Sequence, residues 1–290
     1  MMTTRKPLQA YTVTFGDRAE NEAGMQMIGT AAARGMSIGE MESLKCKLHE
    51  QGARVSVFQL NQLLPVHAQN KTEKAQVLVI KNGVSFLLQH EDAESKVLGE
   101  LQRMPKDSTT LMYGRVVNKH ARHNNTIGDF DQAPEIAKGK GTVVNFKDYP
   151  YMDQMRCAAT KLVGSPTQLV GELNDYFDAN LCGIGWHGDL ERKYVVGMRM
   201  GPGAKGMPLK YQWFHESRAV GDELQIILDA GDIYIMSQKA VGFDWKHSSK
   251  YTLRHAAGKS TCAHAKTKRP RDDKAHVVKK WIPGVSGAEF

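Results

Sequence analysis

Two features are scarce in this chain of 290 residues: cysteine and long apolar runs. The four cysteines are Cys46, Cys157, Cys182 and Cys262. They are scattered and form no Cys-x-x-Cys pair, so neither a disulfide framework nor a zinc ribbon is indicated. No apolar run approaches the roughly 20 residues that cross a bilayer, and the charged N-terminus lacks the apolar segment of a secretory signal. We therefore expect a soluble intracellular protein, nuclear or cytoplasmic, with no membrane partner.

Acidic residues are outnumbered by basic ones, 31 to 39, which gives a formal net charge of +8. Such an excess suits a polyanionic partner, because clustered lysines and arginines bind phosphates without regard to sequence. The charge is concentrated in residues 259–290, where eight basic residues face three acids. This basic C-terminal extension is either a solubilising tail or a phosphate-binding segment. A hydrophobic content of 41% is ordinary for a globular protein that buries a core.

Residues 1–107 are predicted to form a small α+β module, to which the sequence assigns no role. Helices are expected at 19–33 and at 93–104. A further helix is expected to start at the capping box formed by Ser37 and Glu40. Strands are expected at 11–15, 54–60 and 75–80, and Asn82-Gly83 predicts a hairpin between the last of these and 84–88. No residue of this module suggests chemistry.

In residues 108–258 the sequence pattern changes to short strands separated by turns. A helix is expected to begin at Pro150 and end near Val163, before the strands of the core. This spacing predicts an α+β fold whose core is a jelly roll, or double-stranded β-helix, with supporting helices. The six strands that we assign to this core are 170–177, 194–200, 209–214, 224–228, 233–236 and 251–256.

The motif His187-Gly188-Asp189 could supply two ligands to a metal ion, because residues two apart point to the same face of a strand. A third ligand must come from elsewhere, and His247, which follows a predicted strand, is the preferred candidate. Two imidazoles and one carboxylate leave half of an octahedron open, as in the non-haem Fe(II) oxygenases. His255 is the alternative third ligand; it follows Arg254 directly and is expected on the opposite face of the strand.

Four stretches together resemble the AlkB-like branch of the Fe(II)/2-oxoglutarate-dependent dioxygenases. They are Asn174–Tyr176, Ile184–Asp189, Asp229–Tyr234 and Tyr251–Gly258. The resemblance covers roughly residues 110–258 and does not reach the first hundred residues. It implies a catalytic centre in which His187, Asp189 and His247 bind Fe(II).

The same resemblance implies how the cosubstrate 2-oxoglutarate binds. Asn174 and Tyr176 would contact it, and Arg254 would bind its distal carboxylate, as a guanidinium suits a carboxylate. The family commonly has two arginines six residues apart on this last strand, whereas Ser248 occupies the earlier position here. Lys250 is therefore kept as an alternative cation.

The implied activity is the oxidation of a methyl or alkyl group by O2, with release of succinate and CO2. A nucleic-acid base in DNA or RNA is the favoured substrate, and an enzyme of this kind must take the base out of its stack. Oxidative demethylation and hydroxylation both remain open. So do two other hypotheses: a dioxygenase of proteins or small molecules, and a non-catalytic nucleic-acid-binding module. The candidate substrate-binding residues are Arg115, Asn118, Arg122 and Trp186.

Overall fold

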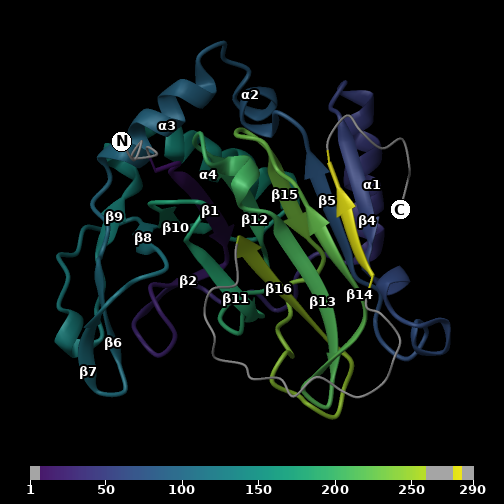
Figure 1. Cartoon of the computed structure of the whole chain (residues 1–290). Helices are drawn as coiled ribbons and strands as arrows, with labels where there is room; N and C mark the ends of the chain where they lie inside the picture. Colours follow the sequence, from purple (N-terminus) through teal and green to yellow (C-terminus); the bar gives the residue numbers. More distant parts are fainter. Residues whose placement is uncertain (1–6, 259–276, 283–290) are drawn as a thin grey trace, which may run out of the picture.

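The computed structural model describes residues 7–258 and 277–282. Strands dominate it, helices are few, and the sheets are open, so the expected α+β class is confirmed. An eight-stranded and a five-stranded sheet make up most of the molecule (Figure 1). No helix within the described residues is long and apolar enough to span a membrane.

The eight-stranded sheet has the order β4-β5-β15-β12-β1-β10-β8-β9, and all its pairs are antiparallel except β8 with β9. Its strands, in chain order, are β1 (Ala10–Gly16), β4 (Val55–Gln59), β5 (Gln76–Ile80), β8 (His123–Gly128), β9 (Val143–Asn145), β10 (Val170–Tyr176), β12 (Val196–Met200) and β15 (Ile233–Met236).

The five-stranded sheet has the order β11-β16-β13-β14-β17. Its strands are β11 (Gly183–His187), β13 (Leu209–His215), β14 (Arg218–Ile226), β16 (Thr252–Gly258) and β17 (Val278–Trp281). From β10 to β16 the chain passes repeatedly from one sheet to the other, and only β13 and β14 follow each other in the same sheet. Consecutive strands therefore face each other across the interior.

Helices cover the other face of the eight-stranded sheet, so β5 is buried on both sides and is apolar almost throughout. Its Leu78 and Ile80 belong to the core beneath the helices, whereas Val77 and Val79 belong to the core between the two sheets. The α-helices are α1 (Ile38–Glu50), α2 (Gly83–Leu88), α3 (Ala93–Arg103) and α4 (Pro150–Val163). The 3₁₀ turns are η1 (Leu60–Leu63), η2 (Val66–Ala68), η3 (Ile136–Lys138), η4 (Phe146–Asp148) and η5 (Ala204–Gly206).

The longer strands of the first hundred residues join the eight-stranded sheet, so the expected module of residues 1–107 has no main sheet of its own. Strand β1 lies between β10 and β12, and β4 and β5 extend the same sheet beyond β15. Pairing with β10 aligns Thr12 with Asn174, and pairing with β12 aligns Thr12 with Arg199. The N-terminal strand is thus an interior strand of the sheet assigned to residues 108–258.

Two local predictions are wrong. Instead of a helix at 19–33, the chain forms a short hairpin of β2 (Arg18–Glu20) and β3 (Met27–Gly29). The segment is held by tertiary contacts: the buried Asp17 carboxylate accepts hydrogen bonds from the backbone N–H groups of Ala32, Lys193 and Tyr194.

The hairpin predicted at Asn82-Gly83 is also wrong, because these residues begin helix α2. Asn82 is left-handed with φ of 51°, as a hairpin turn would require, but Gly83 packs against Ile233 so closely that a Cβ would lie 2.9 Å from its side chain. Tertiary packing thus decides the structure of a segment whose local signal favours a turn.

Part of the basic C-terminal extension is a strand. Residues 278–281 form β17, which pairs with β14 in parallel, and Trp281 packs edge-on against Phe58 with ring centroids 5.3 Å apart. Residues 259–276 and 283–290 lie outside the described residues, and with them the remainder of the predicted phosphate-binding segment.

The capping box predicted at the start of α1 is present and gives a test of local stability. The Glu40 backbone N–H donates to Ser37 Oγ at 3.3 Å, and the Ser37 N–H donates to Glu40 Oε2 at 2.8 Å. Ser37→Ala removes the first bond and should lower the free energy of unfolding by about 1 kcal/mol. The exposed Ser43→Ala, inside the same helix, should be neutral or slightly stabilising. Thermal unfolding of both variants measures the difference, and equal melting temperatures would contradict it.

Candidate metal centre

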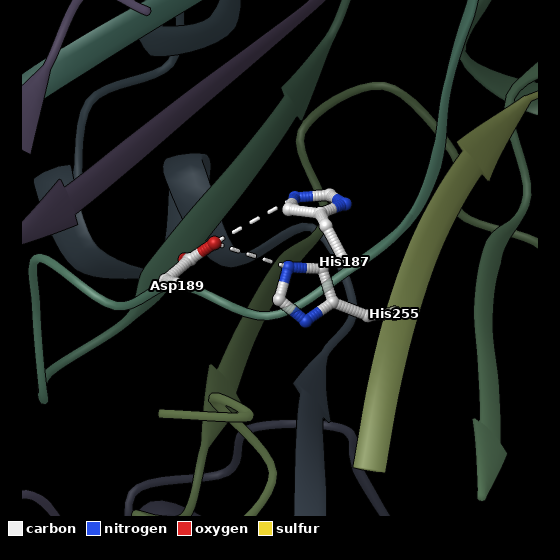
Figure 2. Close-up of side chains that lie close together, drawn as sticks. All are labelled: His187, Asp189 and His255. Atoms are coloured by element: carbon white, nitrogen blue, oxygen red, sulfur yellow. Dashed lines mark ion pairs between the residues drawn. The ribbon is translucent and has the colours of Figure 1, made fainter. Parts of the chain in front are cut away.

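Three side chains converge between the two sheets: His187 and His255 from β11 and β16, and Asp189 just after β11 (Figure 2). Asp189 Oδ1 lies 3.6 Å from His187 Nε2 and 3.4 Å from His255 Nε2. Their potential ligand atoms all lie within 4.8 Å of one another. Ligands at right angles on a metal with bonds of about 2.1 Å are about 3 Å apart, so small side-chain movements would complete such a site. The group can hold a divalent metal ion.

The pairing of β11 with β16 explains why the two imidazoles meet. His187 and His255 are direct partners across the antiparallel strands, and their ring centroids are 4.4 Å apart. A register shift between Ile184 and His187 marks a bulge, which re-aims the end of the strand toward the interior.

The protonation states favour metal binding. His187 Nδ1 lies 2.7 Å from the carbonyl oxygen of Gly185, to which only an N–H can donate, so Nε2 keeps its lone pair for a metal. Burial, together with the neighbouring His255, lowers the pKa of His187 to about 3, so the ring is neutral at physiological pH. Metal ligation requires this neutral form.

Arg192 contacts the second carboxylate oxygen of Asp189, Oδ2. Its Nε lies 3.5 Å from Asp189 Oδ2, and its Nη2 contacts Glu172 and Glu191. Burial would raise the pKa of Asp189, but the charge of Arg192 and the interaction with the neighbouring His255 outweigh it and lower that pKa. Asp189 is thus an anion with Oδ1 directed toward both histidines. Burial raises the pKa of Glu191 to about 7.

A small cavity beside this group is lined by the inner face of the eight-stranded sheet. Its volume is about 60 Å³, so it suits a small ligand rather than a macromolecule. Two rows of cross-strand neighbours contribute to its wall: Asn174, Thr12 and Arg199 in one, and Glu172, Thr14 and Tyr234 in the other.

Arg199 is the most unusual residue of the cavity. Its side chain is completely buried, yet Nε, Nη1 and Nη2 have no hydrogen-bond partner, and it forms no ion pair with a carboxylate of the described residues. Burial lowers its pKa, and the phenols of Tyr234 and Tyr176 are the ionisable groups that interact with it. A buried, unpaired guanidinium is costly unless an anion completes it. The cavity therefore contains an uncompensated positive charge next to the candidate metal centre.

The position of Tyr234 depends on the absence of a side chain at Gly197. A Cβ on Gly197 would lie 1.9 Å from the Tyr234 ring, so the ring lies directly over the backbone of β12. Burial raises the pKa of Tyr234 to about 12, which keeps its hydroxyl group protonated and able to donate a hydrogen bond.

The structure places His255, and not the predicted His247, beside His187 and Asp189. His247 is exposed in the turn before β16, where its backbone N–H bonds to the carbonyl of Asp244. Neighbouring residues of β16 do point to opposite faces, as expected, but His255 rather than Arg254 points inward. The pairing of His255 with His187 determines which residues of β16 face the interior.

Arg254 and its predicted alternative Lys250 also lie outside the lining of the cavity. The Arg254 guanidinium stacks 4.0 Å from the centroid of Phe214 and 5.2 Å from that of Trp245, on the side of β16 away from His255. Lys250 is exposed in the preceding turn. Trp186 packs edge-on against Phe214 and belongs to this outer cluster rather than to the cavity.

The remaining predicted residues lie in or near the cavity wall. Asn174 and Tyr176 line the cavity, as expected from the resemblance. Arg122 donates from Nε to Asn174 Oδ1 at 2.5 Å, which places its charge at the edge of the cavity. Arg115 and Asn118 are exposed on a separate hairpin.

Sequence reasoning missed Thr12, Thr14, Glu172, Arg192 and Arg199. A signal existed for most of them: polar side chains spaced two apart in otherwise apolar strands mark one polar face. Thr12-x-Thr14 in β1 and Glu172-x-Asn174 in β10 follow this pattern. It does not reveal which strands are neighbours.

The fold and the site define an α+β protein with a candidate metal centre between two sheets. The uncharacterized protein R156 of Acanthamoeba polyphaga mimivirus is 40% identical over 250 residues, which cover 86% of this chain and 96% of the viral protein. The chain therefore belongs to the same family as this viral protein. No family model matches the chain.

Proposed function

We propose that this protein is an Fe(II)- and 2-oxoglutarate-dependent dioxygenase, with His187, Asp189 and His255 as the iron ligands. The observation that carries the proposal is the shared cavity: two histidines and one carboxylate stand beside a buried arginine that lacks an anion. A cosubstrate with an oxo-acid group at one end and a carboxylate at the other matches both features. Neither feature alone favours this chemistry over a structural metal site.

The ligand set supports iron in an open coordination sphere. Two imidazoles and one carboxylate are the protein ligands of non-haem Fe(II) oxygenases, whereas closed structural zinc sites use four ligands, usually with cysteine. Within the described residues, the metal-binding group includes no fourth histidine, cysteine or acid. Positions would remain for a bidentate oxo acid and for O2.

The arrangement of strands supports the jelly-roll core expected from the resemblance. Strands β10, β1, β12 and β15 form four neighbouring antiparallel strands of one sheet, and β11, β16, β13 and β14 form four of the other. Two such sheets joined by repeated crossings are the layout of a double-stranded β-helix. Strand β1 takes the place that a final strand after β16 would fill, so this core would be circularly permuted.

The charged and phenolic residues Arg199, Tyr234 and Arg192 have distinct roles in the proposed reaction. The bound Fe(II) would supply O2 activation coupled to decarboxylation of 2-oxoglutarate: one oxygen atom enters succinate, CO2 leaves, and the other oxygen atom hydroxylates a C–H bond of the substrate. Arg199 binds the distal carboxylate, and the hydroxyl group of Tyr234 lies near its charge. Arg192 keeps the Asp189 carboxylate ionised and oriented.

The substrate proposed for this centre is a methylated nucleic-acid base. The net charge of +8 and the cationic Arg122 at the edge of the cavity support a polyanionic substrate. An N-methyl group would be released as formaldehyde after hydroxylation, and a C-methyl group would remain as hydroxymethyl. The cavity itself is too small for a base together with the cosubstrate, so the substrate would react at its mouth.

The proposal is tested by incubating the full-length protein with Fe(II), 2-oxoglutarate, O2 and a panel of methylated DNA and RNA oligonucleotides. Succinate is measured by NMR and modified nucleosides by mass spectrometry. We expect O2-dependent succinate formation that at least one oligonucleotide stimulates. Absence of succinate under all conditions would contradict the dioxygenase, whereas succinate without any change in the nucleosides would favour a protein or small-molecule substrate.

A further inference from the structure

A hairpin projects from the end of the molecule that carries β8 and β9 (Figure 1). We name it the arm, residues 109–123; it comprises β6 (Thr109–Met112), β7 (Arg115–Asn118) and the segment that leads into β8. Strand β7 is exposed along its whole length, and Tyr113 at the tip has 92% of its surface exposed. Met112, Val116 and Val117 are exposed beside it. Such a concentration of exposed apolar side chains marks an interaction surface.

The backbone at the tip gives a second indication. Tyr113 and Gly114 form a two-residue turn with φ of 51° and 73°, and Met112 pairs directly with Arg115. Positive φ at both central residues defines a type I′ turn, in which asparagine or glycine is strongly preferred at the first position. A bulky tyrosine there is unusual and disfavours the turn. Its presence at the most exposed point of the arm therefore needs a reason other than folding.

The charge of the arm identifies its partner. Residues 109–123 contain Arg115, Lys119 and Arg122 and no acid. Cations interleaved with an exposed aromatic ring are typical of surfaces that bind phosphates while a base stacks on the ring. A protein partner of the same arm would have to be acidic and would leave the planar ring without a matching surface.

The base of the arm connects to the candidate metal centre. The Lys119 ammonium group donates to Asn21 Oδ1 at 3.0 Å and to the side-chain oxygen of Asn124. Arg122 donates to Asn174, which lines the cavity, and forms an ion pair with Glu22. A strand of nucleic acid that follows these cations from the tip would be led toward the cavity.

We infer that the arm is a nucleic-acid-binding element in which Tyr113 stacks on a base while the exposed Arg115 contacts the backbone phosphates. This inference rests on the proposed function, because it gives the dioxygenase its means of holding a base near the centre. A target base that leaves its stack costs unstacking free energy, and a stacking side chain compensates for part of it.

The test measures binding of the full-length protein to a fluorescein-labelled 20-nucleotide DNA, as a single strand and as a duplex, by fluorescence anisotropy. Tyr113→Asn places a preferred residue in the turn, so the arm should fold at least as well while it loses the ring. We expect about 5- to 100-fold weaker binding to at least one of the two probes, and Tyr113→Trp should retain affinity. Val66→Asn is the matched control, because Val66 is 84% exposed and lies beyond β4 at the opposite edge of the sheet.

The cations are tested through the salt dependence of the same binding. Arg115→Gln should reduce the slope of log K against log salt concentration by about 1, whereas the exposed Lys161→Gln on α4 should leave it unchanged. Unaltered affinity of Tyr113→Asn for both probes, or failure of the wild type to bind either, would overturn the inference.

Failure of the arm and failure of the dioxygenase are distinguishable. Conversion of 2-oxoglutarate to succinate without a nucleic acid, with ascorbate added as the two-electron reductant that replaces the substrate, depends on the metal centre and not on Tyr113. Wild type and Tyr113→Asn should therefore share the same basal rate. A basal rate without Tyr113-dependent binding would refute the arm alone. Tyr113-dependent binding without any turnover would refute the proposed chemistry alone.

Discussion

Replacing His255 by Ala is expected to weaken metal binding at least 100-fold and to abolish formation of succinate. The imidazole of His255 is one of three converging potential ligands, and its Nε2 lies 3.4 Å from Asp189 Oδ1. With one ligand lost, two protein ligands remain, too few to hold a metal in an open site against water. Binding is measured by anaerobic titration with Co(II), which resists oxidation better than Fe(II), and turnover by succinate formation.

The matched control for this variant is His247→Ala. His247 is exposed in the turn before β16, so its loss should change neither metal affinity nor turnover. The pair distinguishes the structural assignment from the one that the sequence favours. If His247→Ala abolished binding while His255→Ala kept it, the proposed ligand set would be refuted.

Arg199→Met is expected to have opposite effects on stability and on cosubstrate binding. The guanidinium is fully buried without a partner, so an apolar side chain of similar length should leave the ligand-free protein as stable or more stable. The same change removes the partner of the distal carboxylate and should raise the Kd for 2-oxoglutarate on the order of 100-fold, or about 3 kcal/mol. Thermal unfolding and calorimetric titration measure the two effects.

Pyruvate provides the control for this second experiment, because it is a 2-oxo acid without a distal carboxylate. Its weak binding should be equal in wild type and Arg199→Met, and metal binding should be retained. Arg254→Met, which alters the outer face of β16, should leave 2-oxoglutarate affinity unchanged. If Arg254→Met lost this affinity and Arg199→Met did not, the distal carboxylate would have to be assigned to the outer cluster instead.

The site was predictable from sequence only where its residues are local. The motif His187-x-Asp189 identifies two potential ligands because the alternation of a strand determines their common direction. Which histidine joins these two residues depends on which residue of β16 pairs with β11, and this register cannot be predicted from the sequence. Arg199 was missed because it faces Thr12 on β1, almost two hundred residues earlier in the chain.

The fold, too, was predictable only where its elements depend on local sequence signals. Helix α4 was predicted with its observed bounds because Pro150 and Gly164 mark its ends, and the capping box predicted the start of α1. The insertion of β1 between β10 and β12 could not be predicted, because an edge strand and an interior strand with the same alternation look alike. Segment 19–33 was misassigned because buried hydrogen bonds to Asp17, rather than local propensity, hold its backbone.

The most direct test of the proposed centre is an anaerobic titration of the purified protein with Fe(II), followed by 2-oxoglutarate, monitored by visible absorption. A 2-oxo acid that chelates Fe(II) gives a charge-transfer band that neither component shows alone. We predict one Fe(II) per chain and a band that appears with 2-oxoglutarate in the wild type and is absent in His255→Ala. Tight binding of 2-oxoglutarate without iron, or an unchanged band in His255→Ala, would contradict the assignment of His187, Asp189 and His255 as the iron site.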